Sequence, residues 1–266
     1  MPLKTAYKKL IPIRLRNLLR LKFKSLRQVL YRGDAVSCLC CGGSYARFAP
    51  FGAVTPRPNA ACPRCDSLER HRFLYYFLGQ KTDFFSQKLS VLHFAPEFVL
   101  EQLFRSQRAW NYTTADIVDG LADIAFDMQA IPLKNDSLDL IICSHVTSYT
   151  DDEPLALREL CRVLKPETGV LLQLTRIHKP TEQSFTGGAL DTAARETIYG
   201  FDPFVRWLHG RDYPEILREN GFDVTLIAPT DFVTLNFAQK YGFINAENDV
   251  FDGETIFLCK KIKKTG

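Results

Sequence analysis

The sequence predicts an α/β protein in which a doubly wound, mostly parallel sheet follows a small N-terminal module held by four cysteines. From about residue 89, apolar runs of strand length alternate with amphipathic stretches of helix length. Ahead of them, four cysteines stand in the pattern C-x2-C-x20-C-x2-C. The 266 residues, 46% of them hydrophobic, suffice for one full core and a small appendage. Two large domains are therefore not expected.

The first 34 residues are predicted to form a basic amphipathic helix. Residues 1–33 contain ten Lys and Arg and no acid, which leaves 24 basic against 30 acidic residues in the rest. Leucines recur at helical spacing between about Ile13 and Tyr31, and basic residues fall on another face. Packing of the apolar stripe on the protein's own body is the favoured interpretation. Peripheral contact with a membrane surface and binding of nucleic acid are the alternatives.

Residues 35–80 form the second predicted unit, called here the four-cysteine module, which comprises a zinc-ribbon-like segment and a linking helix. Each C-x2-C turn can direct two thiolates at one tetrahedral ion, so Cys38, Cys41, Cys62 and Cys65 predict a structural Zn²⁺ site. Four thiolates leave no open position, so the zinc is expected to stabilise the fold and not to catalyse. The segment between the pairs is too short for a core of its own.

Two other residues of this unit are alternative zinc ligands, and neither is favoured. Cys40 in place of Cys38 or Cys41 would break the two-residue spacing. His71 lies in a helix predicted from Leu68 to about Leu78, and hydrogen bonding at the helix surface or between domains is the favoured role for it. Reduced cysteines and the absence of an 18-residue apolar run or a signal region predict a cytoplasmic protein.

The third predicted unit, residues 81–266, carries the alternating strands and helices. A segment at 176–210 breaks the alternation and is predicted to be a lid or insertion over the sheet. The predicted strands are 90–94, 112–116, 124–126, 138–143, 169–174, 223–227 and 255–260, and the predicted helices are 96–108, 153–164 and 213–220.

Four linked features follow the second strand of this unit. They are an acid at Asp127, Ile131-Pro132, the run Asp136-Ser-Leu-Asp139 before an apolar strand, and Arg162-Val-Leu-Lys-Pro166. At these separations the chain resembles the class I S-adenosylmethionine-dependent methyltransferases, especially the type 11 group, over about residues 89–175. The four-cysteine module with its Ser67-Leu-Glu-Arg-His-Arg72 run is also similar to a subgroup of bacterial methyltransferases. The resemblance implies a Rossmann-like sheet of seven strands.

The resemblance also implies roles for individual residues. Asp116, at the end of the second strand, would bind the ribose hydroxyls of S-adenosylmethionine, with Ile117 beside it, which agrees with the position of a ribose-binding acid in doubly wound sheets. Asp127 and Met128 would hold the adenine. Ser144 and His145 would border the methyl group, and His145 is the first candidate for a proton acceptor, although a purely structural histidine beneath the adenosine is an equal alternative.

The first cofactor loop departs from the family pattern, because His93-Phe-Ala95-Pro96-Glu97 contains no glycine. Ala95 is small enough to preserve close approach, His93 lies at the start of the loop, and Glu97 is a candidate for binding the cofactor's ammonium. If the substitutions block the pocket, the domain is an inactive, zinc-containing interaction protein.

Residues in and beside the predicted lid are second candidates for catalysis. They are His178, His209, Asp212 and Tyr213, and a structural role is the favoured interpretation for each of them. Tyr149 with Asp151 and Asp152 is a further candidate wall for the acceptor, although an acid pair before a helix is more commonly a cap. The predicted function is methyl transfer (EC 2.1.1) to a small molecule, a sugar or a surface glycan. The alternative is an RNA methyltransferase that binds its substrate through the four-cysteine module and the basic N-terminal helix. The mild excess of acidic residues in the rest of the chain does not favour this alternative.

Overall fold

A computed structural model describes residues 25–52, 56–177, 182–186, 204–244 and 255–262. Its centre is a seven-stranded sheet with the order β12-β13-β9-β8-β5-β6-β7. All neighbouring strands are parallel except β13, which is antiparallel to both β12 and β9. The strands are β5 (Leu89–Phe94), β6 (Trp110–Asp116), β7 (Ile124–Ala125), β8 (Leu140–Ser144), β9 (Val170–Leu174), β12 (Phe222–Ile227) and β13 (Ile256–Lys261). The predicted doubly wound, mostly parallel sheet of seven strands is confirmed.

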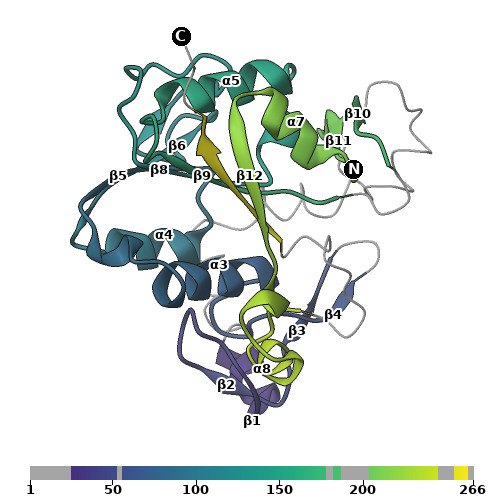
Figure 1. Cartoon of the computed structure of the whole chain (residues 1–266). Coiled ribbons are helices and arrows are strands. Elements are labelled where there is room, and N and C mark those ends of the chain that lie inside the picture. The colour runs from purple at the N-terminus through teal and green to yellow at the C-terminus, as the bar shows by residue number, and fades with distance from the viewer. Residues whose placement is uncertain (1–24, 53–55, 178–181, 187–203, 245–254, 263–266) are drawn as a thin grey trace, which may run out of the picture.

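Helices cover both faces of this sheet (Figure 1). One apolar layer joins the sheet to α3 (Glu69–Gln80) and α4 (Phe98–Arg105). The other joins it to α5 (Glu153–Val163) and α7 (Tyr213–Glu219). Every residue of β8 and β9 is buried, because a strand covered on both faces has no solvent side. This explains why these two strands are apolar apart from Ser144 in β8 and Gln173 in β9.

The motif residues of the third unit hold its loops together. Arg162 donates hydrogen bonds to the carbonyl oxygens of Ile131 (2.7 Å) and Leu133 (2.9 Å). Lys165 donates to Asp139 at 2.8 Å. The Arg-Val-Leu-Lys-Pro run thus fixes the segment that precedes β8, which gives a physical reason for the spacing between the two motifs.

Helix boundaries follow local chemistry. The Asp152 carboxylate accepts a hydrogen bond from the Leu155 amide and caps α5, which ends before Lys165-Pro166 as predicted. Helix α4 begins at Phe98 and not at Pro96, because Ala95 has a φ of +44° and turns the chain away from helical geometry first. The helix therefore begins two residues later than predicted, and it ends at Arg105, three residues earlier than predicted.

The four-cysteine module contains two small antiparallel pairs, β1 (Arg32–Ser37) with β2 (Ser44–Tyr45) and β3 (Ala49–Phe51) with β4 (Arg57–Ala61). A segment from the far end of the chain, with α8 (Leu235–Lys240), packs against it (Figure 1). The ring of Phe243 lies 5.6 Å from that of Phe73. The sequence-based prediction placed this segment in the third unit, residues 81–266. In the structure it shares one core with the four-cysteine module.

Arg72 connects these two parts of the chain. Its guanidinium is fully buried and donates to the carbonyl oxygens of Ala60, Ser67 and Gly242. It also lies 4.1 Å from the centre of the Phe48 ring. A charged group that is buried without an acid needs several carbonyl acceptors, and the fold provides them here.

The predicted basic helix lies partly outside the described residues. Its described end, residues 25–30, is helical, and Arg27 binds Asp66 at 2.8 Å. Leu26, Val29 and Leu30 are more than half exposed in the described structure. Among the described residues, no helix is long and apolar enough to cross a membrane. Contact of this helix with a membrane surface stays a prediction.

The predicted lid is also only partly described. Its described parts include the two-stranded pair β10 (Phe185–Thr186) and β11 (Trp207–Leu208). His178 lies outside the described residues.

Candidate functional site

The four predicted zinc ligands come together in the four-cysteine module. The sulfur atoms of Cys38, Cys41, Cys62 and Cys65 all lie within 4.8 Å of one another. Cys38 Sγ lies 3.6 Å from Cys65 Sγ, and Cys41 Sγ lies 3.6 Å from Cys62 Sγ. Tetrahedral zinc with Zn–S bonds of about 2.3 Å places its sulfurs about 3.8 Å apart. The cysteine cluster therefore fits a zinc ion.

The two C-x2-C turns have the same backbone geometry. The amide of Gly42 donates to the carbonyl oxygen of Cys38, and the amide of Asp66 donates to that of Cys62. Gly42 (φ +69°) and Asp66 (φ +60°) occupy equivalent positions in the left-handed region. A repeated turn of this kind directs both thiols of each pair toward one point.

Two residues next to the cluster have distinct roles. The Ser67 hydroxyl lies 3.1 Å from Cys38 Sγ and 3.2 Å from Cys65 Sγ, so it can donate to thiolates bound to a metal. Cys40 Sγ donates instead to the carbonyl oxygen of His71 at 3.8 Å. This geometry is compatible with the predicted ligand set, which leaves Cys40 out.

The second candidate site lies at the carboxyl edge, defined here as the edge where the parallel strands β5, β6, β7, β8 and β9 end. In register, Phe94 is opposite Ala115 on β6 and Cys143 on β8, and Asp116 is opposite Ala125 on β7. The chain winds from β5 to β6 and β7 on one side and then crosses to β8 on the other. This edge thus contains the switch point at which doubly wound sheets bind ligands.

Asp116 and Asp127 lie at neighbouring strand ends. The Phe126 amide donates to the Asp116 carbonyl oxygen, so Asp127 follows the residue that pairs with Asp116. Asp116 Oδ1 accepts from the Val118 amide (2.8 Å), and Asp127 Oδ1 accepts from the Gln129 amide (2.9 Å). Each carboxylate is thus oriented by its own turn and still has acceptor capacity left.

The other predicted adenosine contacts differ in exposure. Ile117 is 72% exposed, whereas Met128 is 4% exposed and packs in the apolar layer with Phe94 and Ile131. Ala95 is exposed, and its positive φ is the backbone conformation that usually selects glycine. The loop without glycine therefore keeps a glycine-like turn.

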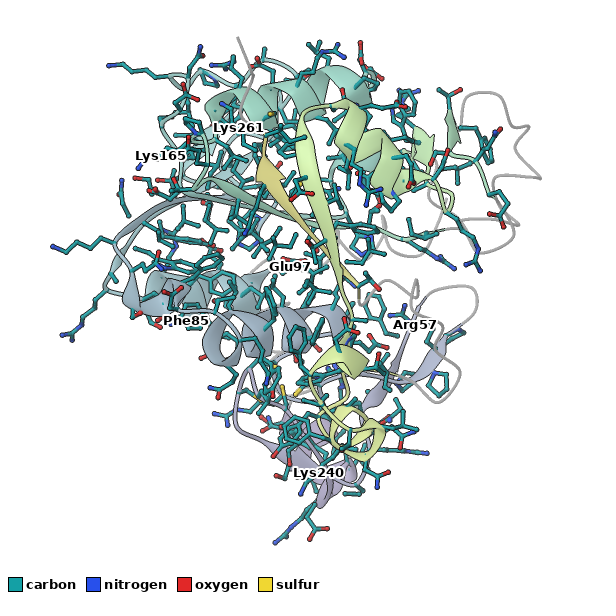
Figure 2. All side chains as sticks on the ribbon, viewed as in Figure 1. Arg57, Phe85, Glu97, Lys165, Lys240 and Lys261 are labelled. Carbon is teal, nitrogen blue, oxygen red and sulfur yellow. The ribbon has the colours of Figure 1, made fainter. Side chains whose placement is uncertain are left out.

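Glu97 is the centre of a polar cluster between the sheet and α3 (Figure 2). The Ser144 hydroxyl donates to Glu97 Oε1 at 2.8 Å, which connects the ends of β5 and β8 across the switch point. His71 Nε2 lies 3.1 Å from the same oxygen, and Arg70 Nε lies 3.9 Å from it. His93 Nε2 lies 3.4 Å from Glu97 Oε2. The cluster joins the four-cysteine module to the carboxyl edge.

The protonation states of this cluster follow from its contacts. His71 Nδ1 accepts from the Leu68 amide (3.2 Å), so in the neutral ring the proton is on Nε2 and faces Glu97. Burial lowers the pKa of His71 and keeps it neutral at pH 7, although Glu97 opposes this effect. Burial alone raises the pKa of Glu97, but contacts with His71 and His93 outweigh burial and hold it well below its usual range. Glu97 is therefore a carboxylate.

His145 follows β8 with a φ of +57°, and its amide donates to the Leu174 carbonyl oxygen. Its Nε2 atom is buried and has no hydrogen-bond partner among the described residues. Burial and the nearby charge of Arg70 lower the pKa of His145 well below its usual range. The ring is thus neutral at pH 7 and retains an unused polar atom beside the switch point.

The second candidates of the lid region form a buried structural network. His209 Nε2 lies 2.9 Å from the Glu153 carboxylate, and its Nδ1 lies 2.7 Å from the Thr175 hydroxyl. The Tyr213 hydroxyl donates to Glu153 at 3.2 Å, and its ring stacks 3.9 Å from that of His209. His209 and Tyr213 are at most 1% exposed. This geometry favours the structural role for these residues.

The polar candidates at the neighbouring loops also have structural partners. Asp212 accepts from the amide and the hydroxyl of Ser184, and Asp152 caps α5. Asp151 lies 3.4 Å from Arg206 at the surface. Tyr149 is 42% exposed and is thus open to a ligand.

Arg70 and Tyr112 were not expected at the site. Tyr112 places its hydroxyl 2.7 Å from His93 Nδ1, and when it donates there the His93 proton faces Glu97. The signal for Arg70 was present in the sequence as the charged run Glu69-Arg-His-Arg72 before an aromatic helix end. Only the packing of α3 beneath the sheet shows which of these side chains reach the carboxyl edge.

The chain is similar to known methyltransferases in sequence and in fold. Residues 91–172 match a family model described as "Methyltransferase domain". A putative sarcosine dimethylglycine methyltransferase from Galdieria sulphuraria is 15% identical, with 70% of this chain and 84% of that chain covered and a TM-score of 0.46. A methyltransferase from Mesorhizobium loti, described as S-adenosylmethionine dependent, is 16% identical, with 65% and 90% covered and a TM-score of 0.45.

A chain from the complex between the Haloferax volcanii Trm112 methyltransferase activator and the putative methyltransferase is 15% identical, with 66% and 84% covered and a TM-score of 0.43. The family match begins within β5 and ends within β9. It includes all four linked sequence motifs. Residues 91–172 of this chain are therefore similar to the methyltransferase domain that this family model describes.

Proposed function

We propose that this protein transfers a methyl group from S-adenosylmethionine to an oxygen or nitrogen atom of a small molecule, a sugar or a surface glycan. The family match supports methyl transfer as the reaction class. The proposal extends it to a cofactor site at the carboxyl edge, to individual residues and to a class of acceptor.

The observation that carries the cofactor site is the pairing of Asp116 with Asp127 at neighbouring strand ends. A carboxylate can accept two hydrogen bonds from a ribose diol, and another can accept one from the exocyclic amine of adenine. Ile117, which is exposed next to Asp116, offers an apolar surface to the purine. The two acids thus match two polar groups of adenosine that are separated by an apolar ring system.

S-Adenosylmethionine supplies a sulfonium-bound methyl group that is displaced in line by the acceptor. Positioning provides much of the rate of such a reaction, so the chain's task is to align the acceptor and take up its proton. His145 follows β8, is neutral, and has an Nε2 atom with no hydrogen-bond partner in the part of the chain that the structure describes. We assign it the uptake of the acceptor's proton.

The surroundings of the edge favour a small acceptor over RNA. Phe98, Ile117, Val118 and Leu121 are all more than half exposed and follow the ends of β5 and β6. A nucleic-acid site would instead need basic residues that neutralise phosphates. If RNA is the acceptor, binding of cellular RNA weakens steeply with salt, and a flat salt response supports the small acceptor.

Calorimetry with S-adenosylhomocysteine tests the cofactor site. Asp116→Ala should weaken binding at least about tenfold, since a charged acceptor of the diol is lost. Asp116→Asn keeps an oxygen to accept from the Val118 amide, so it separates loss of charge from loosening of the turn. Asp119→Ala, three residues further in the same exposed loop, is the matched control and should bind within about twofold of the wild type.

Two outcomes would contradict the proposal. Equal affinity of Asp116→Ala and the wild type would move the ribose site elsewhere. No heat of binding with the wild type at millimolar ligand would leave the alternative of a zinc-containing interaction protein.

A further inference from the structure

The described end of the basic N-terminal helix turns its apolar side to solvent. Leu26, Val29 and Leu30 are 54%, 70% and 71% exposed. Arg27, from the basic side of the same helix, is bonded to the protein instead. Its guanidinium lies 2.8 Å from the Asp66 carboxylate of the four-cysteine module, and its side chain is 18% exposed. This orientation is the reverse of that of an amphipathic helix that packs on its own protein, so the exposures do not support such packing here.

The sequence predicts that the same two sides continue toward the N-terminus. At helical spacing, Leu15, Leu18 and Leu19 share about a third of the circumference with the three exposed residues. Arg16, Arg20 and Lys24 fall on the side of Arg27. Lys22 is the one base within the apolar stripe, and the stem of a lysine can lie along an apolar surface while its ammonium stays in water.

The charge of this helix favours an anionic partner. Residues 1–33 contain ten Lys and Arg and no acid. A two-fold dimer formed through the helix would bring two such segments together with no acid in either to offset their repulsion. A negatively charged surface attracts every one of these bases.

An anionic lipid surface uses both sides of the helix, whereas nucleic acid uses only one. The aliphatic Leu26, Val29 and Leu30 can enter the boundary between headgroups and acyl chains, and the bases can contact the headgroups. RNA phosphates would also bind the bases but would leave the aliphatic side chains in water. Unpaired nucleic-acid bases stack on aromatic rings, and residues 25–30 contain none.

We infer that the basic N-terminal helix binds the surface of a membrane that contains anionic lipids, with Leu26, Val29 and Leu30 inserted among the headgroups. The inference is independent of the proposed function. Only Tyr31 separates the helix from β1, which begins at Arg32, and Arg27 connects the helix to the four-cysteine module. Binding therefore holds the folded body of the protein at the membrane, because no long linker intervenes.

Co-sedimentation of the full-length protein with lipid vesicles tests this inference. One set of vesicles contains phosphatidylcholine and phosphatidylglycerol in equal amounts, and the other contains phosphatidylcholine alone. The protein should bind the anionic vesicles at least about tenfold more tightly, and this preference should shrink as salt is raised.

Two variants separate the apolar contribution from the charged one. Val29→Gln with Leu30→Gln should weaken binding to the anionic vesicles at least about tenfold at every salt concentration, since insertion is lost. Both side chains are exposed, so the unfolding temperature should not change. Arg16→Gln with Arg20→Gln should weaken binding at least about tenfold at low salt and by less at high salt.

Ile262→Gln provides the control for the loss of an exposed aliphatic side chain. Ile262 is 48% exposed and follows Lys261, which lies at the opposite end of the molecule from Lys240 of α8 (Figure 2). This variant should bind the anionic vesicles within about twofold of the wild type.

Three outcomes would overturn the inference. The first is a wild type that does not bind the anionic vesicles, and binding of single-stranded RNA in its place would assign the helix to nucleic acid. The second is equal vesicle binding by the wild type and the Val29→Gln, Leu30→Gln variant. The third is a lower unfolding temperature or a changed oligomeric state of that variant, which would show that the apolar side packs on this chain or on a second copy.

Discussion

The four-cysteine module and the central sheet reach stability by different physical routes. Strands β8 and β9 of the sheet are buried along their whole length between two helical layers. In the module, β2 and β3 have two and three residues, and most of β1 is exposed. Strands this short are expected to need a cross-link, and a zinc ion held by the four sulfurs would provide one beside the core that the module shares with the C-terminal segment. We therefore expect apolar burial to dominate the stability of the sheet, and metal binding to contribute a large part of the stability of the module.

Helix α3 belongs to both regions and connects them. Its first residues follow the second cysteine pair, and Phe73, Leu74, Phe77 and Leu78 are buried in the layer beneath the sheet. His71 of the same helix contacts Glu97 at the carboxyl edge. Loss of the module's geometry is therefore expected to reach the cofactor site, and the following predictions test how far the two regions depend on each other.

The largest effect is expected from Cys62→Ser. Zinc binding contributes on the order of 10 kcal/mol to folding of small metal-held domains, so removal of one ligand should unfold the module. Zinc content by mass spectrometry should fall from about one per chain to nearly none, and limited proteolysis should cut within residues 38–65.

Cys40→Ser is the matched control for this change. Cys40 is buried but donates to His71 and lies outside the sulfur group, so zinc content should not change. Zinc loss in this variant, or full zinc in Cys62→Ser, would show that the ligand set is misassigned.

An intermediate effect is expected from Arg72→Met. The change removes a buried guanidinium and leaves the carbonyl oxygens of Ala60, Ser67 and Gly242 without their donor. We expect a loss of about 3–5 kcal/mol in the free energy of unfolding, measured by urea denaturation. Arg64→Met, at an exposed position of the same module, should change it by less than about 0.5 kcal/mol. Similar stability of the two variants would show that Arg72 does not join the module to the C-terminal segment.

The smallest effect is expected in the sheet region, from Glu153→Gln. Burial alone raises the pKa of Glu153, but the His209 contact outweighs it and lowers that pKa. A carboxyl with a lowered native pKa contributes stability that is present above its unfolded pKa of about 4.3 and is lost as the pH falls through the native value. The wild type should therefore exceed the variant by about 2 kcal/mol at pH 7, and the difference should shrink below about pH 4.5.

Urea denaturation at pH 7, 5, 4 and 3 measures this difference. The exposed Glu215, which pairs with Arg218 at the surface, provides the control variant Glu215→Gln. Its difference from the wild type should stay below about 0.5 kcal/mol at each pH. A Glu153→Gln difference that is constant down to pH 3 would contradict the lowered pKa of Glu153.

Much of the fold could be predicted because local patterns and packing agree. The mostly apolar sequences of β8 and β9 predict buried parallel strands, and Asp152 with Lys165-Pro166 marks the two ends of α5. The start of α4 could not be predicted in the same way. Pro96 is a good first helical residue, but the turn at Ala95 is decided by the hydrogen bond from its amide to Ala115 on the neighbouring strand.

The residues of the candidate site also fall into those with a local sequence signal and those that only packing brings together. Asp116 was predicted from its place at a strand end, Asp127 from the motif run that resembles the methyltransferases, and the cysteines from their spacing, and all three signals are local in the chain. The contacts of Glu97 with Arg70 and His71 span about 26 residues and connect two predicted units, and no periodicity records which face of α3 meets the sheet.

By itself the sequence determined the local features of the protein. These are the segments that form strands, the thiols that can share an ion, and the acids that end a strand. Tertiary structure alone decided that residues 229–244 complete the four-cysteine module and that Arg72 is buried among carbonyl oxygens. Spacing fixes what neighbours along the chain can do together. Contacts between distant segments depend on how whole layers pack against each other, and the local sequence pattern does not encode that packing.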